Sequence, residues 1–317
     1  MDIAKKDGRR HMNAILYDVS LPINCVLKDT YKINEIISSS KLSIVYRGEN
    51  LDSGEQVIIK EFYPSDIALR DLDNISVINR LPSTKEKFAE LKENFLHEAV
   101  LLQQIVHKNI VRYLEHFQEN GTIYIVMEFY EGMLLHQYVK RYQLDNRDQL
   151  YKSIFLPLID ALDYLHNKGI LHRDIKPSNI IIDQEGSPQI LDFGSAVFYK
   201  AATAHKIFTS PGFSPLEQYS DKTQQGVYTD IYSLAATFYY ALTDVVPMDV
   251  SQRVIEDGIK NVRQYNKKVS FIMAQAIMWS LTVNAKKRCF SLKFLLLTIL
   301  SESIVIKIKY YFDYNNK

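Results

Sequence analysis

The residues that most constrain this chain are a polar string at 172–179 and, shortly after it, the triplet Asp192-Phe193-Gly194. The string ends at Asn179, and the β-branched run 180–182 that follows it predicts a buried strand. Turn-forming residues at 184–188 then lead into a second short apolar run that ends at Asp192. The pattern predicts a hairpin that brings Asn179 and Asp192 close together.

Four polar side chains of this region form a set that suits phosphoryl transfer. Asp174 can accept a proton from a hydroxyl, and Lys176 can neutralise charge on a phosphoryl group. Asn179 and Asp192 offer oxygen, the ligand type that Mg²⁺ requires. A turn aspartate beside a surface lysine is the structural alternative for the first two, and the completeness of the string argues against it.

Further motifs follow in an order that resembles the protein kinases. Lys176, two residues after Asp174, is typical of their serine/threonine branch, and the runs 60–66 and 211–219 are similar to eukaryotic-like kinases of bacteria. The resemblance extends from about Tyr31 to about Ile299. The remaining motifs are Val57-Ile58-Ile59-Lys60, Glu98, Met127-Glu128-Phe129, Pro215-Leu216-Glu217, Asp230 and Arg288.

The resemblance implies an α+β fold with the two lobes of a protein kinase around one cleft. The small lobe has antiparallel strands and one main helix, and the larger lobe is helical. The expected parts are an N-terminal extension at 1–30, a kinase domain at 31–300 divided near 128, and a tail at 301–317. Apolar patterns predict strands within 31–59, 113–117 and 122–127, a polar insertion at 64–83, and helices at 84–105, 134–142, 149–168, 228–243, 269–283 and 291–302.

The resemblance also implies a site that uses ATP with Mg²⁺, or Mn²⁺ as the alternative ion. Its expected catalytic residues are Asp174 as base, Lys176, and Lys60 paired with Glu98, and its expected metal ligands are Asn179 and Asp192. The main-chain carbonyl of Glu128 and the amide of Tyr130 are expected to bind adenine, behind which Met127 lies. The full set of expected ATP contacts is Ile37, Ser38, Ser40, Ser43, Val45, Ile58, Lys60, Glu128, Tyr130 and Ile181.

Several residues are expected to support this site. Arg173 should carry an unpaired guanidinium able to meet a phosphate on the loop 194–215. Candidate phosphorylation sites on that loop are Thr203 and Thr209. The other expected contacts are Ser210 with Asp174 and Lys176, Glu217 in a buried pair with Arg288, Asp230 with the backbone at 172–173, and His172 stacked with Phe193, Tyr113 and Leu102.

The loop expected to cover the phosphates departs from the kinase pattern. Serine stands in place of each of its three glycines, at Ser38, Ser40 and Ser43. Glycine in such a loop allows positive φ and a close approach of the backbone to phosphate. A serine strained into that conformation costs about 1 kcal/mol. Ile58 stands where alanine is usual, which narrows the adenine slot.

Bulk properties exclude several other classes of function. The formal net charge is +1, from 38 Lys and Arg against 37 Asp and Glu, so no net positive electrostatic field favours the binding of nucleic acid. Cys25 and Cys289 lie far apart, which fits a reducing compartment. The first twenty residues do not resemble a signal peptide, and the apolar run 294–300 is too short to span a bilayer. A cytoplasmic location is expected.

The predicted function is therefore that of a serine/threonine protein kinase acting on a protein hydroxyl, itself included. One alternative is a pseudokinase that serves as a nucleotide-binding scaffold, because serine replaces glycine in the phosphate loop. Another is a small-molecule kinase of the aminoglycoside or choline type, against which Lys176 and Glu217 argue. The sequence predicts neither the substrate protein nor an oligomeric state.

Overall fold

The computed structural model describes residues 19–142, 147–199 and 207–302. These residues form two compact units, of which unit 1 holds the residues up to Val106 and Arg112–Phe129, and unit 2 holds His107–Val111 and the chain from Tyr130 on. The segment His107–Val111 was expected in the small lobe. It belongs to unit 2 because the amide of Val111 donates to the carbonyl of Ile190 at 2.9 Å.

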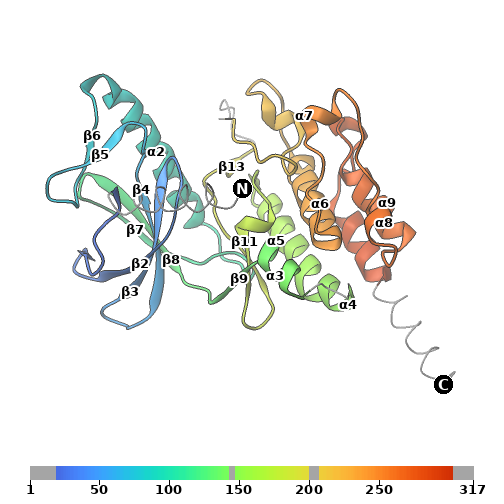
Figure 1. Ribbon diagram of the computed structural model, residues 1–317, viewed down its shortest axis with the longest axis horizontal. Helices are drawn as coiled ribbons and strands as arrows, with labels where there is room; N and C mark the ends of the chain where they lie inside the picture. Colours follow the sequence, from blue (N-terminus) through green and yellow to red (C-terminus); the bar gives the residue numbers. More distant parts are fainter. Residues whose placement is uncertain (1–18, 143–146, 200–206, 303–317) are drawn as a thin grey trace, which may run out of the picture. The chain divides into compact units, whose positions relative to one another are not determined.

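Unit 1 is built on a six-stranded antiparallel sheet with the strand order β1-β2-β3-β4-β8-β7, shown in Figure 1. Strong β-formers fill its central strands, and β8 is buried at every residue from Thr122 to Met127. The strands expected within 31–59, 113–117 and 122–127 are confirmed. Their bounds are β2 Tyr31–Ser39, β3 Ser43–Asn50, β4 Gln56–Phe62, β7 Tyr113–Glu119 and β8 Thr122–Glu128. The sheet also contains β1, Val26–Leu27, which was not expected.

The two faces of β4 are covered by different parts of unit 1. Phe62 packs against Phe88 and Phe95 of helix α2, Lys85–Leu102, with ring centroids 5.2 and 5.5 Å apart. The next residue back, Glu61, points to the opposite face, because successive side chains of a strand alternate. Glu61 is fully buried there beneath Tyr46 and the residues that precede β1.

Residues 64–83 were expected to form a polar insertion, and they belong to unit 1, with Pro64, Ala68 and Val77 buried. They contain a two-stranded sheet of β5, Ala68–Arg70, and β6, Val77–Asn79, followed by a 3₁₀ turn at Pro82–Thr84. Residues 19–30 of the expected N-terminal extension also join unit 1, because β1 pairs with β2 and Leu27 is fully buried. The short strands escaped prediction because polar turn residues separate them.

Unit 2 is mainly helical and is organised around α6, Val227–Thr243. Every residue of α6 from Thr229 to Leu242 is buried, as is typical of a helix surrounded by protein. The helix expected at 149–168 is interrupted by a π-helical turn at Tyr151–Phe155, where Phe155 stacks on Phe238. The other helices are α3 Leu135–Tyr142, α4 Arg147–Leu150, α5 Leu156–Asn167, α7 Val250–Arg253, α8 Val262–Tyr265, α9 Phe271–Ser280 and a helix at 292–302.

Short strands in unit 2 carry the polar string of the sequence. β11, Ile180–Asp183, pairs with β12, Pro188–Ile190, and with β9, Gly132–Leu134. A second small sheet pairs β10, Ile170–Leu171, with β13, Val197–Phe198. The β11–β12 pairing confirms the predicted hairpin. An antiparallel small unit with one main helix and a larger helical unit confirm the predicted α+β kinase fold.

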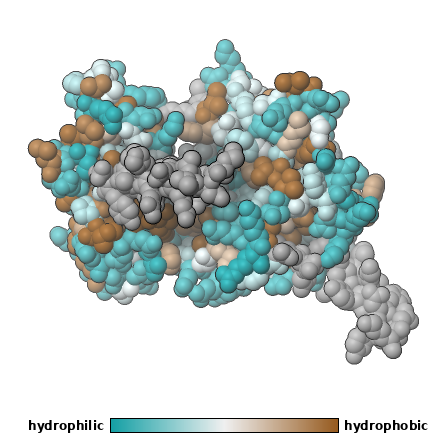
Figure 2. Space-filling model, viewed as in Figure 1, coloured by the Kyte–Doolittle hydropathy of each residue, from teal (hydrophilic) through white to brown (hydrophobic). Residues whose placement is uncertain are grey.

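Hydrophilic residues predominate on the face shown in Figure 2, and the apolar residues there lie in separate groups. No helix within the described ranges is long and apolar enough to cross a membrane.

Candidate active site

The polar string 172–179 connects β10 to β11, and Asp230 near the start of α6 fixes its first residues. The two carboxylate oxygens of Asp230 accept the amides of His172 at 2.9 Å and Arg173 at 2.7 Å. Burial opposes ionisation of Asp230, but the bonds from His166 and these amides hold the pKa of Asp230 below its usual value. The expected role of Asp230 in holding this backbone is confirmed.

Asp174, Lys176 and Ser210 form a closed triangle of hydrogen bonds. The Lys176 ammonium donates to Asp174 Oδ2 and to Ser210 Oγ, both at 2.8 Å. The Ser210 hydroxyl donates to the other oxygen of Asp174 at 2.7 Å, which confirms the expected contact. The Asp174 side chain is 16% exposed and that of Lys176 is 24% exposed, so both can meet a substrate.

The Asn179 amide nitrogen donates to Asp174 Oδ2 at 2.9 Å and to the Asp174 carbonyl at 3.0 Å. Across the hairpin, the amide of Leu191 donates to the Asn179 carbonyl at 2.8 Å, so the backbone that bears Asp192 lies beside Asn179. Asp192 has a left-handed backbone with φ of 48°, and Arg173 does as well with φ of 68°. Two oxygen-bearing side chains on adjoining strand ends fit the hard cation expected from the sequence.

The predicted pair of Lys60 and Glu98 is confirmed within unit 1. The Lys60 ammonium contacts both carboxylate oxygens of Glu98, at 2.7 and 3.0 Å. Lys60 comes from β4 and Glu98 from α2, and their side chains are 10% and 5% exposed. The pair therefore joins the sheet to its helix in a largely water-free environment.

Other expected ATP contacts of unit 1 share a face of the sheet with Lys60. Val45 of β3 is the cross-strand partner of Lys60, and Ile58 of β4 is the partner of Met127. Residues opposite each other on neighbouring strands project to the same side, so these side chains form one surface. Ile37 lies on β2 and is 47% exposed, and the amide of Glu128 donates to the carbonyl of Arg112. Tyr130 and Ile181 belong to unit 2.

The serines of the phosphate loop do not adopt the left-handed conformation that glycine would allow there. No serine from Ser38 to Ser43 has a positive φ. Instead, the hydroxyl of Ser40 accepts the amides of Leu42 at 3.2 Å and Ser43 at 3.1 Å. A serine hydroxyl can close a turn in this way without a left-handed residue.

The expectation of an unpaired guanidinium on Arg173 was wrong. Arg173 is 2% exposed, and its Nη1 donates to the carbonyl of Ser195 at 3.3 Å. Burial lowers the pKa of Arg173, and the Asp230 carboxylate opposes that shift. His172 does meet Phe193 edge to face, with centroids 4.7 Å apart. Of the candidate phosphorylation sites, Thr209 is exposed and Thr203 lies outside the described residues.

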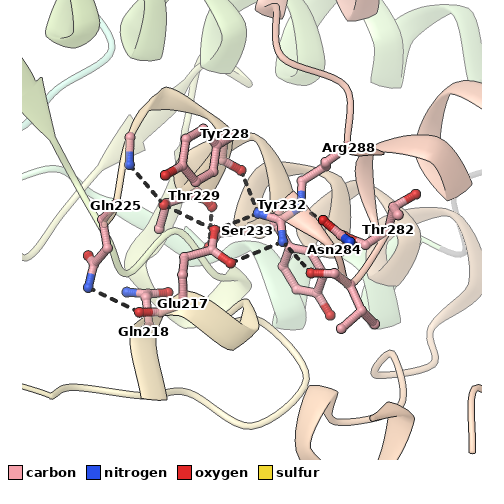
Figure 3. A network of polar contacts seen from close by, with 12 residues as sticks. Glu217, Gln218, Gln225, Tyr228, Thr229, Tyr232, Ser233, Thr282, Asn284 and Arg288 are labelled. Atoms are coloured by element: carbon pink, nitrogen blue, oxygen red, sulfur yellow. Dashed lines mark hydrogen bonds and ion pairs between the residues drawn. The ribbon is translucent and has the colours of Figure 1, made fainter. Parts of the chain in front are cut away.

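The predicted buried pair of Glu217 and Arg288 is confirmed and is shown in Figure 3. Arg288 contacts the two oxygens of Glu217 at 2.6 and 3.1 Å, in the bidentate arrangement that the guanidinium favours. Thr229 of α6 donates to the same carboxylate at 3.1 Å. The side chains of Arg288 and Glu217 are 0% and 3% exposed, so the segment that follows Ser210 is anchored in the core of unit 2.

Sequence reasoning missed a second buried network, which lies in unit 1. The guanidinium of Arg70 binds both oxygens of Glu61, at 2.7 and 2.8 Å. Tyr46 donates to Glu61 at 2.7 Å, and Tyr124 does so at 3.3 Å. Burial and the neighbouring carboxylate raise the pKa of both tyrosines, which keeps their hydroxyls protonated as donors. Arg70 lies in the stretch 64–83, which the sequence predicted as a polar insertion. The position of Glu61 directly after Lys60 on β4 was the available sequence signal for this network.

Asp249 also escaped prediction. It is the N-cap residue of α7, and its Oδ2 accepts the amide of Gly212 at 3.0 Å and the hydroxyl of Tyr219 at 2.9 Å. A side chain at Gly212 would lie 2.7 Å from the carbonyl of Pro247, so the loop approaches this part of unit 2 closely. Asp249 therefore fixes the segment that carries Ser210.

Comparison with known proteins agrees with this arrangement. A mouse protein, sperm motility kinase 2B, is 29% identical over 61% of this chain and 40% of its own length. A probable serine/threonine-protein kinase 2 of Plasmodium falciparum is 26% identical over 84% of this chain and 49% of its own length. The probable serine/threonine-protein kinase PknB of Lactococcus lactis is 24% identical over 84% of this chain and 41% of its own length. The chain thus spans less than half the length of each of these relatives.

A solved structure titled PpkA-294 apo form is 28% identical, with a TM-score of 0.74 over 89% of this chain and 99% of that one. The profile of the protein kinase domain family matches residues 31–296, which include Lys60, Glu98, the string 172–179 and Asp192. That range takes in most of both units. The chain therefore belongs to the protein kinase domain family.

Proposed function

We propose that the protein transfers the γ-phosphoryl group of Mg-ATP to a serine or threonine hydroxyl of a protein, including its own. The observation that carries this proposal is the triangle of Asp174, Lys176 and Ser210. It places a carboxylate and an ammonium in direct contact and at the surface of unit 2. The serine/threonine kinases among the similar proteins support the class of acceptor.

The proposed chemistry follows from these groups. The acceptor hydroxyl oxygen forms a bond to the γ-phosphorus while the bond from that phosphorus to the bridging oxygen of ADP breaks. Asp174 accepts the hydroxyl proton, and Lys176 balances charge on the transferred group. Lys60, held by Glu98, supplies a further cation to the phosphates. The ion bound by Asn179 and Asp192 would neutralise charge on the phosphate oxygens.

The hydrogen bonds of the triangle explain why Lys176 is needed in this proposal. Its ammonium contacts Asp174 at 2.8 Å, which places a positive charge beside the site of phosphoryl transfer. Asn179 donates to the same oxygen, which keeps the base oriented toward one side. We also propose that the protein acts in the cytoplasm, where ATP is available. The free thiols of Cys25 and Cys289 support a reducing compartment.

The test is incorporation of labelled phosphate from γ-labelled ATP into the protein and into a generic basic protein. Asp174→Asn should reduce the rate by at least about a hundredfold, because general-base catalysis supplies that much. Asp221→Asn, a matched change at an exposed aspartate, should leave the rate unchanged. A wild-type protein that binds Mg-ATP but incorporates no phosphate would contradict the proposal and favour a pseudokinase.

A further inference from the structure

The turn that joins β2 to β3 is closed by one side chain, Ser40. Its Oγ accepts the amide of Leu42 at 3.2 Å and the amide of Ser43 at 3.1 Å. The hydroxyl oxygen of Ser43 lies 3.1 Å from the same atom, and the Ser43 carbonyl accepts the amide of Ser40 at 2.8 Å. These contacts make Ser40 Oγ the centre of the turn.

The same peptide groups are held at their other ends by the residues that follow β4. The carbonyl of Lys41 accepts the amide of Ser65 at 3.0 Å, and the carbonyl of Leu42 accepts the amide of Tyr63 at 2.9 Å. Each of the two peptide planes is therefore fixed twice, by its carbonyl and by its N–H. Loss of the Ser40 hydroxyl would release the two N–H groups while their planes stay fixed by the carbonyls.

Backbone N–H groups that converge on one point are a common way to bind a phosphate oxygen. In this turn the two N–H groups of Leu42 and Ser43 already converge, and Ser40 Oγ occupies the point at which they meet. Each N–H has one hydrogen, so a strong bond to phosphate requires it to leave the hydroxyl.

We propose that Ser40 is an internal competitor for phosphate, whose hydroxyl occupies the amides of Leu42 and Ser43 and so weakens the binding of the ATP phosphates. This inference rests on the proposed function, because it takes Mg-ATP as the ligand of this turn. It makes Ser40 a residue that sets nucleotide affinity, and it assigns different roles to neighbouring serines that look equivalent in the sequence.

The neighbouring residue Ser39 provides a matched control. Ser39 is exposed, and its hydroxyl makes no hydrogen bond within the part of the chain that the structure describes. Ser40→Ala and Ser39→Ala remove the same atom from consecutive positions. Ser40→Thr keeps a hydroxyl and should behave as the wild type, and Ser40→Gly checks that the result does not depend on alanine.

The experiment measures the dissociation constants of Mg-ATP and of adenosine by calorimetry for the wild type and these variants. Ser40→Ala and Ser40→Gly should bind ATP about three- to tenfold more tightly, the range of one net hydrogen bond. Adenosine, which has no phosphate, should bind equally to all of them. Ser39→Ala and Ser40→Thr should match the wild type for both ligands.

Equal or weaker ATP binding by Ser40→Ala, with adenosine binding unchanged, would overturn the inference while leaving the proposed function intact. Weaker binding of both ligands would overturn it as well, since the hydroxyl would then only maintain the fold of unit 1. Tighter ATP binding in a protein that transfers no phosphate would support Ser40 as a competitor and reject the proposed kinase activity. The role of Ser40 is therefore tested by ATP affinity, and the proposed function by phosphate incorporation.

Discussion

Two buried ion pairs of unit 1 begin at consecutive residues of β4. Lys60 points to the α2 face and pairs with Glu98, whereas Glu61 points to the opposite face and pairs with Arg70. Both pairs are nearly excluded from water, with side-chain exposures of 10% and 5% against 0% for Glu61 and 4% for Arg70. Burial alone therefore does not separate a functional pair from a structural one.

The surroundings of each pair distinguish the functional pair from the structural one. Arg70 also donates to the carbonyls of Val19 and Ile75, so it ties the residues before β1 and the β5–β6 hairpin to β4. Lys60 is on the face that holds Val45 and Ile58, the expected nucleotide contacts. We infer that Lys60–Glu98 serves phosphoryl transfer and that Glu61–Arg70 serves the stability of unit 1.

Lys60→Met should produce the largest effect. Removal of a cation that acts on the reacting phosphates should reduce the rate of phosphate incorporation about a hundred- to thousandfold. The surface substitution Lys32→Met, which breaks a pair with Glu49 at 3.1 Å, should leave the rate unchanged. A Lys60→Met protein with more than about a tenth of the wild-type rate would contradict the role of the Lys60–Glu98 pair in phosphoryl transfer.

Arg70→Met should have the largest effect on stability. It leaves the carboxylate of Glu61 buried without its cation, which should lower the free energy of unfolding in urea by about 3 kcal/mol. The double variant Glu61→Leu with Arg70→Met should lose less than Arg70→Met alone, because no buried charge remains. An Arg70→Met protein as stable as the wild type would contradict the structural role assigned to this pair.

The smallest effect is expected at a surface pair on the same sheet, between Lys28 and Glu115. Their side chains are 48% and 30% exposed, so Glu115→Gln should lower stability by less than about 1 kcal/mol. Partial burial raises the pKa of Glu115, but bonds from Lys28 and Tyr31 outweigh it and hold the pKa below the usual 4.5.

The sign of the pH dependence follows from that direction. A carboxyl group with a lowered pKa in the folded state stabilises the protein fully above pH 4.5 and loses this contribution as pH falls through its folded-state pKa. Melting temperatures of wild type and Glu115→Gln should therefore differ above pH 4.5 and converge below it. A difference that grows in acid would contradict the assigned partners.

The sequence predicted Lys60–Glu98 and missed Glu61–Arg70 for a physical reason. The kinase resemblance implied the pair of Lys60 and Glu98, and helical periodicity placed Glu98 on a long helix. Arg70 lies on a strand of three residues followed by the polar turn 71–76, which carries no periodic pattern. Its burial arises from contacts with distant residues such as Val19, which local patterns do not report.

Details of the phosphate loop and of the helix at 149–168 were also missed, because they depend on the geometry of the folded chain. The substitution of glycine by serine was visible, but the bonds of Ser40 that make a positive φ unnecessary depend on the geometry of the turn. Likewise, apolar spacing predicted the helix at 149–168 but not its π-helical turn, where Phe155 stacks on Phe238. The polar string and its hairpin were predictable because their residues act through fixed short spacings.

The most direct test of the division between the two pairs is the rate of phosphate incorporation per folded molecule of Arg70→Met, with the folded fraction measured in the same sample. The account predicts that this rate equals that of the wild type, although fewer molecules are folded, whereas the rate per folded molecule of Lys60→Met falls about a hundred- to thousandfold. A rate per folded molecule that falls in Arg70→Met as it does in Lys60→Met would contradict the account, because the two faces of β4 would then serve one function.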